Sequence, residues 1–204
     1  MIAVIDYGGG NLGSLRSGLE RRGAEFVVTG DPTVVARADA AILPGDGAFG
    51  ATMAALEARG LDAAVRDALA ARKPFLGICV GMQLLYERST EHGEHRGFGV
   101  FEGTVERLTA PRVPHMGWNA LEPLHPHPFA ASLRAGDYVY FLHSYRAPVG
   151  PETVAAVTYG ERFSAIVARD NVMGTQFHPE KSQRVGALLL DGFLCIVHET
   201  TCVR

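Results

Sequence analysis

The stretch PFLGICVGMQ, residues 74–83, decides the fold. Within it, residues 75–78 form a short apolar run, which is typical of a strand covered on both faces in a parallel sheet. The next stretch, QLLYE at residues 83–87, carries apolar side chains at helical spacing. The sequence therefore predicts a buried strand that ends at Cys79 and turns at once into a helix running to Glu87.

Cys79 has the surroundings of a catalytic nucleophile. Gly77 and Gly81 flank it at two residues on either side, which is the pattern of a nucleophile elbow with sulfur in place of a serine hydroxyl. The glycines are needed because the turn is tight and a side chain on either flank would collide with a neighbouring element. A helix N-terminus would favour the thiolate over the thiol. Two alternatives stay open, a small core cysteine and an inert or redox-sensing cysteine in a binding subunit.

The totals describe one soluble domain. The chain has 204 residues, of which 47% are hydrophobic and 20% charged, so we expect a single domain over residues 1–204. The net charge of −3 and the lack of a Lys/Arg-rich stretch predict no nucleic-acid partner and no membrane-surface partner. Residues 1–6, MIAVID, have neither a basic lead-in nor a long apolar run, and three widely spaced cysteines fit a reducing compartment. A cytoplasmic protein is expected.

A glycine-rich turn near the start offers a competing interpretation. The strand expected at residues 2–5 is followed by Gly8-x-Gly10-x-x-Gly13 and a helix, and Asp31 lies where a ribose-binding acid belongs. A dinucleotide-binding dehydrogenase is therefore an alternative. Against it, such an enzyme usually needs a second substrate domain, and no linker or change of composition marks one.

Alternating strands and helices predict an α/β fold with a mostly parallel central sheet flanked by helices. A third strand at residues 39–43 enters the turn Gly45-Asp46-Gly47, which should face the same crevice as Cys79, because loops after parallel strands gather at the strands' carboxyl ends. The oxyanion hole is predicted to use the backbone N–H of Val80 and of the Asp46–Gly47 turn, with the Asp46 carboxylate pointing away.

From about Gly97 the sequence pattern changes to short β-like segments that are broken by proline and glycine. This pattern predicts a β-rich C-terminal extension of the sheet, mixed or antiparallel. The pieces are residues 100–108, 138–142, 154–158 and 163–168. The HPHP stretch at residues 125–128 predicts no metal site, because the prolines stiffen it as a loop and no Cys or acid stands at ligand spacing. No metal site is expected at His92 and His95 either.

His178 and Glu180 supply the expected partners of the nucleophile. The stretch VMGTQFHPE, residues 172–180, reads as a strand that ends in a histidine and precedes the last helix. Pro179 disfavours helix at His178 and keeps it extended, so residues 178 and 180 project to the same side. Cys79, His178 and Glu180 are thus predicted to act as nucleophile, general base and orienting carboxylate. The alternative is a histidine that only caps the last helix.

Two of these stretches together resemble the class I, or triad, glutamine amidotransferases: residues 77–83, GICVGMQ, and residues 178–180, HPE. More narrowly, five stretches are similar to the family of glutaminase subunits of imidazole glycerol phosphate synthases. They are residues 6–11 (DYGGGN), 44–50 (PGDGAFG), 114–119 (PHMGWN), 140–145 (YFLHSY) and 176–182 (QFHPEKS). The resemblance spans nearly the whole chain.

This resemblance implies hydrolysis of L-glutamine to glutamate and ammonia without a cofactor. The ammonia would pass to a (β/α)8-barrel cyclase subunit, the other half of a heterodimer in histidine biosynthesis, and the glutaminase would be slow without that partner. Sibling amidotransferases for anthranilate, guanylate or pyridoxal phosphate synthesis are the nearest rivals. The resemblance also implies a set of glutamine-pocket residues, namely Gly45, Gln83, Glu91, His143, Ser144 and Tyr145. Asn11, Trp118 and Tyr138 are implied to face the cyclase, although both aromatic residues could instead be core residues.

Overall fold

The parallel part of the central sheet is built from short strands. The computed structural model describes residues 1–10 and 12–202. Four of its five parallel strands are buried at every position, which explains why each reads as an apolar run rather than an alternating pattern. The five are β2 (Phe26–Thr29), β1 (Ile2–Ile5), β3 (Ala40–Leu43), β4 (Phe75–Ile78) and β14 (Val172–Thr175), in their order across the sheet.

Three antiparallel strands continue this sheet beyond β14. They are β13 (Glu161–Arg169), β12 (Thr153–Tyr159) and β9 (Glu122–Pro123), in that order. The fold is therefore α/β, with a mostly parallel sheet that becomes antiparallel on one side, as the sequence predicts.

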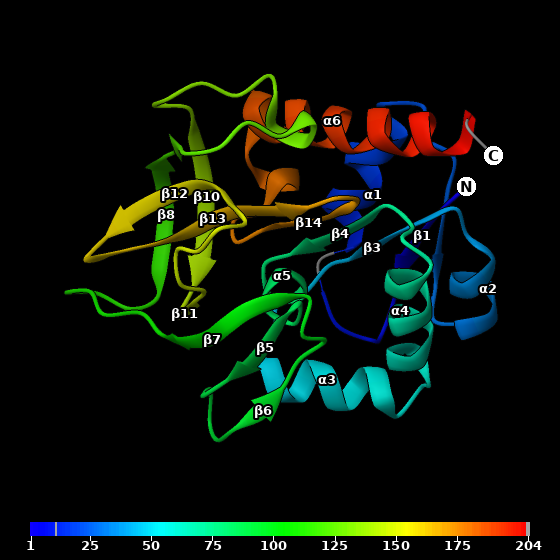
Figure 1. Cartoon of the computed structure of the whole chain (residues 1–204), viewed down its shortest axis with the longest axis horizontal. Helices are drawn as coiled ribbons and strands as arrows, with labels where there is room; N and C mark the ends of the chain where they lie inside the picture. Colours follow the sequence, from blue (N-terminus) through cyan, green and yellow to red (C-terminus); the bar gives the residue numbers. More distant parts are fainter. Residues whose placement is uncertain (11, 203–204) are drawn as a thin grey trace.

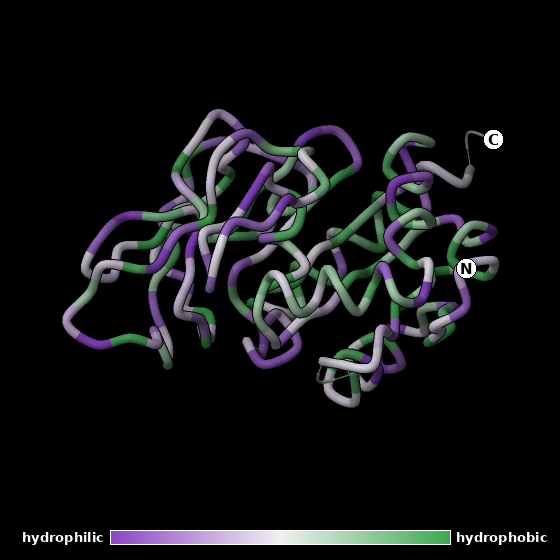
Figure 2. The backbone as a smooth tube through the Cα atoms, turned by 90° about the horizontal axis from the view of Figure 1, so that it is seen from below, coloured by the Kyte–Doolittle hydropathy of each residue, from purple (hydrophilic) through white to green (hydrophobic). Residues whose placement is uncertain are grey.

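Helices cover both faces of the sheet (Figure 1). Figure 1 shows α1 (Leu12–Glu20) and α6 (Gln183–Cys202) on the upper side, and α3 (Phe49–Glu57) and α4 (Leu61–Ala70) on the lower side. The short helix α2 (Pro32–Arg37) packs beside α4. Helices α1, α3 and α4 each bury part of their residues. In Figure 2, purple hydrophilic stretches occur in several of the loops at the edge of the molecule.

The remaining strands form two small sheets instead of joining the main one. One pairs β8 (His115–Ala120) with β10 (Tyr138–His143), and the other has the order β11-β7-β5-β6. Its strands are β11 (Tyr145–Arg146), β7 (Phe101–Arg107), β5 (Tyr86–Ser89) and β6 (His95–Arg96). The expected strands near residues 100–108 and 138–142 exist, but they do not extend the main sheet, and β8 was not predicted.

The helix predicted through Glu87 is wrong. Helix α5 (Val80–Gln83) ends after one turn, and the chain then enters β5. The carbonyl oxygens that a longer helix would use accept instead from a later segment, with Leu84 O bonded to Phe98 N at 2.7 Å and Leu85 O to Val100 N at 2.7 Å. Long-range pairing therefore overrides the local helical spacing.

The fold brings the carboxyl ends of β3, β4 and β14 to one edge of the sheet. There the β3–α3 loop, the β4–α5 turn and the 3₁₀ turn η2 (Pro179–Lys181) meet the end of β10. A second 3₁₀ turn, η1 (Pro128–Ala130), packs on α6. Within the described residues, no helix is both long enough and apolar enough to cross a membrane.

Candidate active site

Cys79 occupies a strained turn between β4 and α5. Its backbone has φ 55° and ψ −110°, a conformation that L-residues rarely adopt. A Cβ on Gly77 would lie 2.5 Å from Gly81 O, and a Cβ on Gly81 would collide with the carbonyl oxygen of Leu43. The two flanking glycines are thus required by sterics, and the turn places Cys79 at the N-terminus of α5.

His178 and Glu180 meet beside this turn. His178 Nδ1 lies 2.8 Å from Glu180 Oε1, and both side chains are only 4% exposed. The contact agrees with the prediction but the geometry does not, because only His178 is extended, while Glu180 belongs to the η2 turn. Proline ends the extended segment at His178 and starts the turn that brings the carboxylate back to the imidazole.

The pKa of His178 depends on its neighbours Cys79 and Glu180. Burial alone would lower the pKa of His178, but hydrogen bonding to Cys79 and Glu180 and the attraction of their negative charges raise it above its ordinary value. Since Nδ1 is held by Glu180, Nε2 is the nitrogen left for the sulfur. His178 is thus placed to hold a proton beside the sulfur.

Backbone contacts hold both reacting groups against β10. His178 N donates to Tyr140 O at 3.1 Å, and the Cys79 thiol lies 3.8 Å from Leu142 O. The Ser182 hydroxyl donates to His178 O at 2.7 Å and accepts from Tyr140 N at 2.9 Å. The histidine is therefore fixed by main-chain hydrogen bonds from an element remote in sequence.

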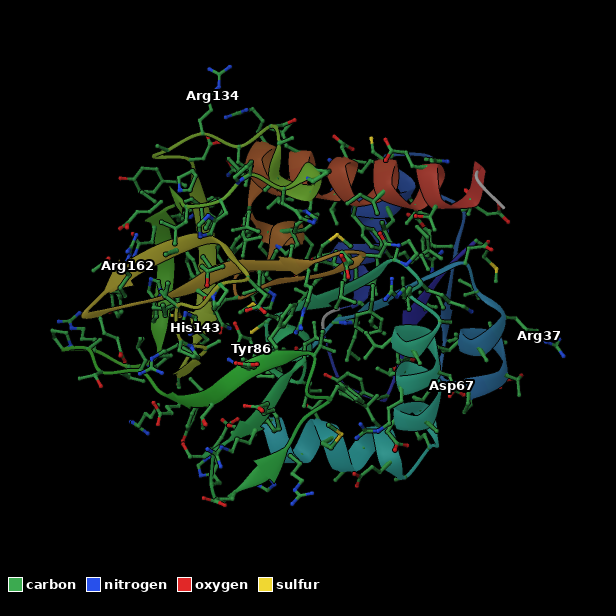
Figure 3. All side chains as sticks on the ribbon, viewed as in Figure 1. Arg37, Asp67, Tyr86, Arg134, His143 and Arg162 are labelled. Carbon is green, nitrogen blue, oxygen red and sulfur yellow. The ribbon has the colours of Figure 1, made fainter. Side chains whose placement is uncertain are left out.

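A small cavity of about 200 Å³ opens over Cys79. It is lined by Asp46, Gly47, Cys79, Val80, Gln83, Glu91, Leu142, His143, Ser144, Tyr145, His178 and Lys181. Most of the residues predicted from sequence are thus brought together, although their roles in binding stay predictions. His143 lies at the lower end of β10 in the view of Figure 3. Leu142 and Lys181 were not predicted.

Two predicted residues stand just behind this lining. Glu180 contacts the cavity only through His178. Gly45 packs under Val80, because a Cβ there would lie 3.0 Å from Val80 Cβ and 3.1 Å from Gly81 N. Its lack of a side chain lets the β3–α3 loop approach the elbow closely, which is the geometry that an oxyanion hole shared by the two segments needs.

The Asp46–Gly47 loop carries one unusual neighbour, Tyr7. Burial is the main reason why the pKa of Tyr7 is raised, and the negative charge of Asp46 raises it further. The Asp46 carboxylate thus helps to raise the pKa of the Tyr7 hydroxyl group. That it points away from the sulfur stays a prediction.

Glu91 combines two contacts. Its carboxylate accepts from Phe49 N at 2.6 Å, at the start of α3, where Ala48 provides no side-chain cap. The same residue lines the cavity. A carboxylate held by a helix N-terminus is fixed in place, so it suits the recognition of an ammonium group.

The dinucleotide alternative is not supported by the first glycine-rich turn. Gly8, with φ +92°, donates its N–H to Asp6 Oδ1 at 2.9 Å, and the Arg59 guanidinium lies where a Cβ on Gly8 would be. Asp31 caps α2, accepting from Thr33 N at 2.8 Å. Arg59 therefore occupies the space beside Gly8, and the Asp31 carboxylate is already bonded to the N-terminus of α2.

The described part of the chain contains no group of three or more His, Cys, Asp or Glu side chains able to hold a metal. His127 caps the η1 turn by accepting from Phe129 N at 3.1 Å. A larger cavity of about 720 Å³ lies around the HPHP loop, but its lining is mostly apolar and contains no nucleophile. The smaller cavity over Cys79 is therefore the candidate active site.

Trp118 and Tyr138 are exposed, at 46% and 58%, so they are not core aromatics. They lie on the outer face of the β8–β10 sheet together with Met116 and Leu142, which are 67% and 37% exposed. Asn11, which the sequence also assigned to a partner surface, lies outside the described residues.

A family model for the class-I glutamine amidotransferases matches residues 3–195. The chain belongs to this family. It is 46% identical to the imidazole glycerol phosphate synthase subunit HisH of Salinibacter ruber, over 96% of this chain and 94% of that protein. It is 47% identical to the HisH subunit of Aquifex aeolicus, over 93% of this chain and 94% of that protein.

Solved structures share the amidotransferase fold. One crystal structure of a glutamine amidotransferase aligns with a TM-score of 0.76 at 21% identity, over 97% of this chain and 98% of the other. A glutamine amidotransferase from Thermotoga maritima aligns with a TM-score of 0.64 at 16% identity, over 98% of this chain and 84% of the other. The chain is an enzyme of the glutamine amidotransferase class.

The amidotransferase site also contains a buried polar network that sequence reasoning missed. His143 Nε2 lies 3.1 Å from His115 Nδ1, and His143 Nδ1 lies 2.9 Å from Tyr145 O. Gln83 Nε2 donates to the same carbonyl at 2.9 Å and to Gln176 Oε1 at 3.0 Å. The only signal in the sequence was a polar residue, Gln176, just after a wholly buried strand.

We expect acid to destabilise this amidotransferase through the two histidines. Burial lowers the pKa of His115 to about 4 and that of His143 to about 3. Between pH 6.5 and 4 the unfolded chain therefore binds protons that the folded chain does not, so the free energy of unfolding falls as the pH drops.

His115→Phe tests this, since a ring is kept between Tyr159 and Phe141. The variant loses a donor to His143, so it should be less stable at neutral pH. Its free energy of unfolding in urea should nevertheless fall by about 3 kcal/mol less between pH 7 and pH 4 than that of the wild type. An equal fall in both proteins would contradict the assignment.

Proposed function

We propose that this chain is the glutaminase subunit of an imidazole glycerol phosphate synthase. The observation that carries the proposal is the identity of 44–47% with HisH subunits over nearly the full length of both chains. It hydrolyses L-glutamine to glutamate and ammonia and supplies the ammonia to a cyclase subunit in histidine biosynthesis.

The residues around the cavity perform the reaction as follows. The Cys79 thiolate attacks the side-chain amide carbon of glutamine, and the resulting oxyanion is held by the N–H groups of Val80 and the Asp46–Gly47 loop. His178 gives its proton to the departing ammonia, which leaves a thioester. The same imidazole, held by Glu180, then takes a proton from water as the water attacks the thioester, and glutamate leaves.

Glutamine itself is held by the groups at the far end of the cavity. Glu91 and the oxygen of Gln83 accept from the α-ammonium group, since the Gln83 nitrogen is already used by Tyr145 O and Gln176. His143 supports this end by donating to Tyr145 O. A neutral His143 suits that role, because burial lowers its pKa to about 3.

The partner is a cyclase subunit with a (β/α)8 barrel, and it docks on the exposed face of the β8–β10 sheet. This face presents four exposed large apolar side chains, Met116, Trp118, Tyr138 and Leu142. In the cyclase, the ammonia reacts with a phosphoribulosyl formimino intermediate, giving imidazole glycerol phosphate and an aminoimidazole carboxamide ribotide. Residues 1–204 act as one domain in the cytoplasm, with no nucleic acid or membrane partner.

The test is glutamate release by the purified chain, with and without the purified cyclase and its substrate. The proposal expects slow release alone and a large increase in the complex. If the wild type released no glutamate in the complex, the proposal would be overturned, and an equal rate with and without the cyclase would refute activation by the partner. Supplying instead the synthase subunits for anthranilate, guanylate or pyridoxal phosphate tests the sibling alternatives.

The docking face makes its own prediction. Trp118→Ala removes a large exposed aromatic, so affinity for the cyclase should fall by about tenfold or more, while glutamine-independent alkylation of Cys79 stays unchanged. Val149→Ala is the matched control, because Val149 is 40% exposed but lies outside the β8–β10 sheet. Calorimetric titration with the cyclase measures the affinity of the wild type and of each variant. Equal affinities of the wild type and Trp118→Ala would place the interface elsewhere.

A further inference from the structure

The Cys79 sulfur has a buried neighbour with no role in the scheme above. Gln176 Nε2 lies 3.8 Å from Cys79 Sγ, and Gln176 is completely buried. It directly follows β14, whose last residue, Thr175, accepts through its carbonyl from Cys79 N at 2.7 Å. The Gln176 amide is therefore held by the same strand end that holds the backbone of the nucleophile.

The surrounding hydrogen bonds determine which end of the Gln176 amide faces the sulfur. Tyr145 O can only accept, so the Gln83 group that bonds it at 2.9 Å is the amide nitrogen. That nitrogen has a second N–H, which finds Gln176 Oε1 at 3.0 Å. Turning Gln176 over would set two donors against each other and leave the second N–H of Gln83 without its acceptor, so the nitrogen of Gln176 must face Cys79.

The two uncharged neighbours of the sulfur act in opposite directions. Leu142 O, at 3.8 Å, can only accept, so it favours the thiol. Gln176 Nε2 can only donate, so it favours the thiolate. When the thiol proton moves from Sγ to His178 Nε2, the contact with Leu142 is lost and the contact with Gln176 strengthens.

We propose that Gln176 is a catalytic residue that stabilises the Cys79 thiolate by donating a side-chain N–H to the sulfur. Its oxygen at the same time holds the Gln83 amide, so the nucleophile and the pocket for the substrate are set by one side chain. The second part rests on the proposed function, whereas the first does not, because it concerns the sulfur alone.

Other titratable groups lie in the cavity over the sulfur or just behind its lining. They are His178, Glu180 and Lys181 after β14, Asp46 in the β3–α3 loop, Tyr7 after β1, Glu91 after β5, and His143 on β10. All of them are retained in a Gln176 variant. A change in the ionisation of the sulfur in such a variant therefore reports on the amide.

The experiment measures alkylation of Cys79 by iodoacetamide between pH 5 and pH 10, with peptide mass spectrometry to separate Cys79 from the exposed Cys195. Iodoacetamide needs no glutamine pocket, so the measurement is valid even if the chain does not hydrolyse glutamine. In Gln176→Met the pH of half-maximal rate should rise by about one unit, so the reaction should be roughly tenfold slower at pH values well below the wild-type midpoint.

A second variant and a control make the outcome decisive. Gln176→Glu keeps an acceptor for Gln83 but, when ionised, has no donor and adds a negative charge, so its shift should exceed that of the methionine variant. If Gln176→Met does not fold, the pH profile of Gln176→Glu provides the test. Ser164→Ala removes an equally buried group that contacts Thr153 and Pro148, and should leave the profile unchanged.

The proposal is overturned if folded Gln176 variants alkylate Cys79 with the wild-type pH profile. It is also overturned if Ser164→Ala shifts the profile as much as they do, because the effect would then be a general consequence of losing a buried polar group. Thermal unfolding of each variant shows which of them are folded.

Discussion

Replacing Cys79 by alanine is expected to reduce glutamine hydrolysis by about 10⁴-fold or more while the fold is kept. We expect this loss because Cys79, in the strained turn beside His178, is the proposed nucleophile of the cavity. Alanine keeps the β4–α5 turn free of steric conflict, although the strain at φ 55° remains. The measurement is single-turnover glutamate release in the complex with the cyclase.

Comparison with His178→Ala strengthens this test. Residues that act as a unit have strongly non-additive effects, so the double variant should be hardly slower than either single one. Glutamine should still bind to Cys79→Ala, because the groups placed around the substrate are unchanged. Residual turnover within tenfold of the wild type would mean that another group attacks the amide, and the assignment of Cys79 would be wrong.

Gly81→Ala should cause the second largest effect, on both stability and activity. A Cβ at this position collides with the Leu43 carbonyl oxygen on β3, so α5 must move away from the sheet. Backbone is the colliding group, and it cannot rotate away as a side chain can. We expect a loss of about 3 kcal/mol or more, and a fall in Tm of roughly 10 °C.

Activity should fall by about 100-fold in the molecules that stay folded, because Val80 N–H moves with the helix. Gly150→Ala is the control, since the nearest atom to its new Cβ is Glu152 Oε2 at 3.9 Å. That variant should stay within about 0.5 kcal/mol of the wild type. A Gly81→Ala protein with wild-type Tm and turnover would show that the turn tolerates a side chain.

Local sequence patterns predicted the elements around the nucleophile well. The apolar run at residues 75–78 and the two glycines flanking Cys79 constrain strand and turn within a few residues, so no distant part of the chain is needed to interpret them. The strand before His178 follows from the same reasoning, although β14 ends at Thr175 and not at the histidine as the sequence predicted. Bringing Cys79 and His178 together follows from the parallel sheet, whose strand ends share one edge.

Failures of sequence reasoning occurred where distant segments compete for backbone groups. The helix expected through Glu87 is a strand because residues 97–101 take the carbonyls of Leu84 and Leu85. The first glycine-rich turn resembled a dinucleotide-binding site, but the structure places Arg59, from the connection between α3 and α4, against Gly8. Neither partner could be read from the local pattern.

By itself, the sequence determined the α/β class, the elbow at Cys79 and the partnership of His178 with Glu180, because each depends on spacing within one stretch or on the common edge of parallel strands. Tertiary structure alone decided that the backbone of β10 forms a hydrogen bond with His178, that Trp118 is exposed, and that the Gln176 amide faces the sulfur. The physical reason is that the direction of a buried hydrogen bond depends on all of its partners, and these come together only when the chain has folded.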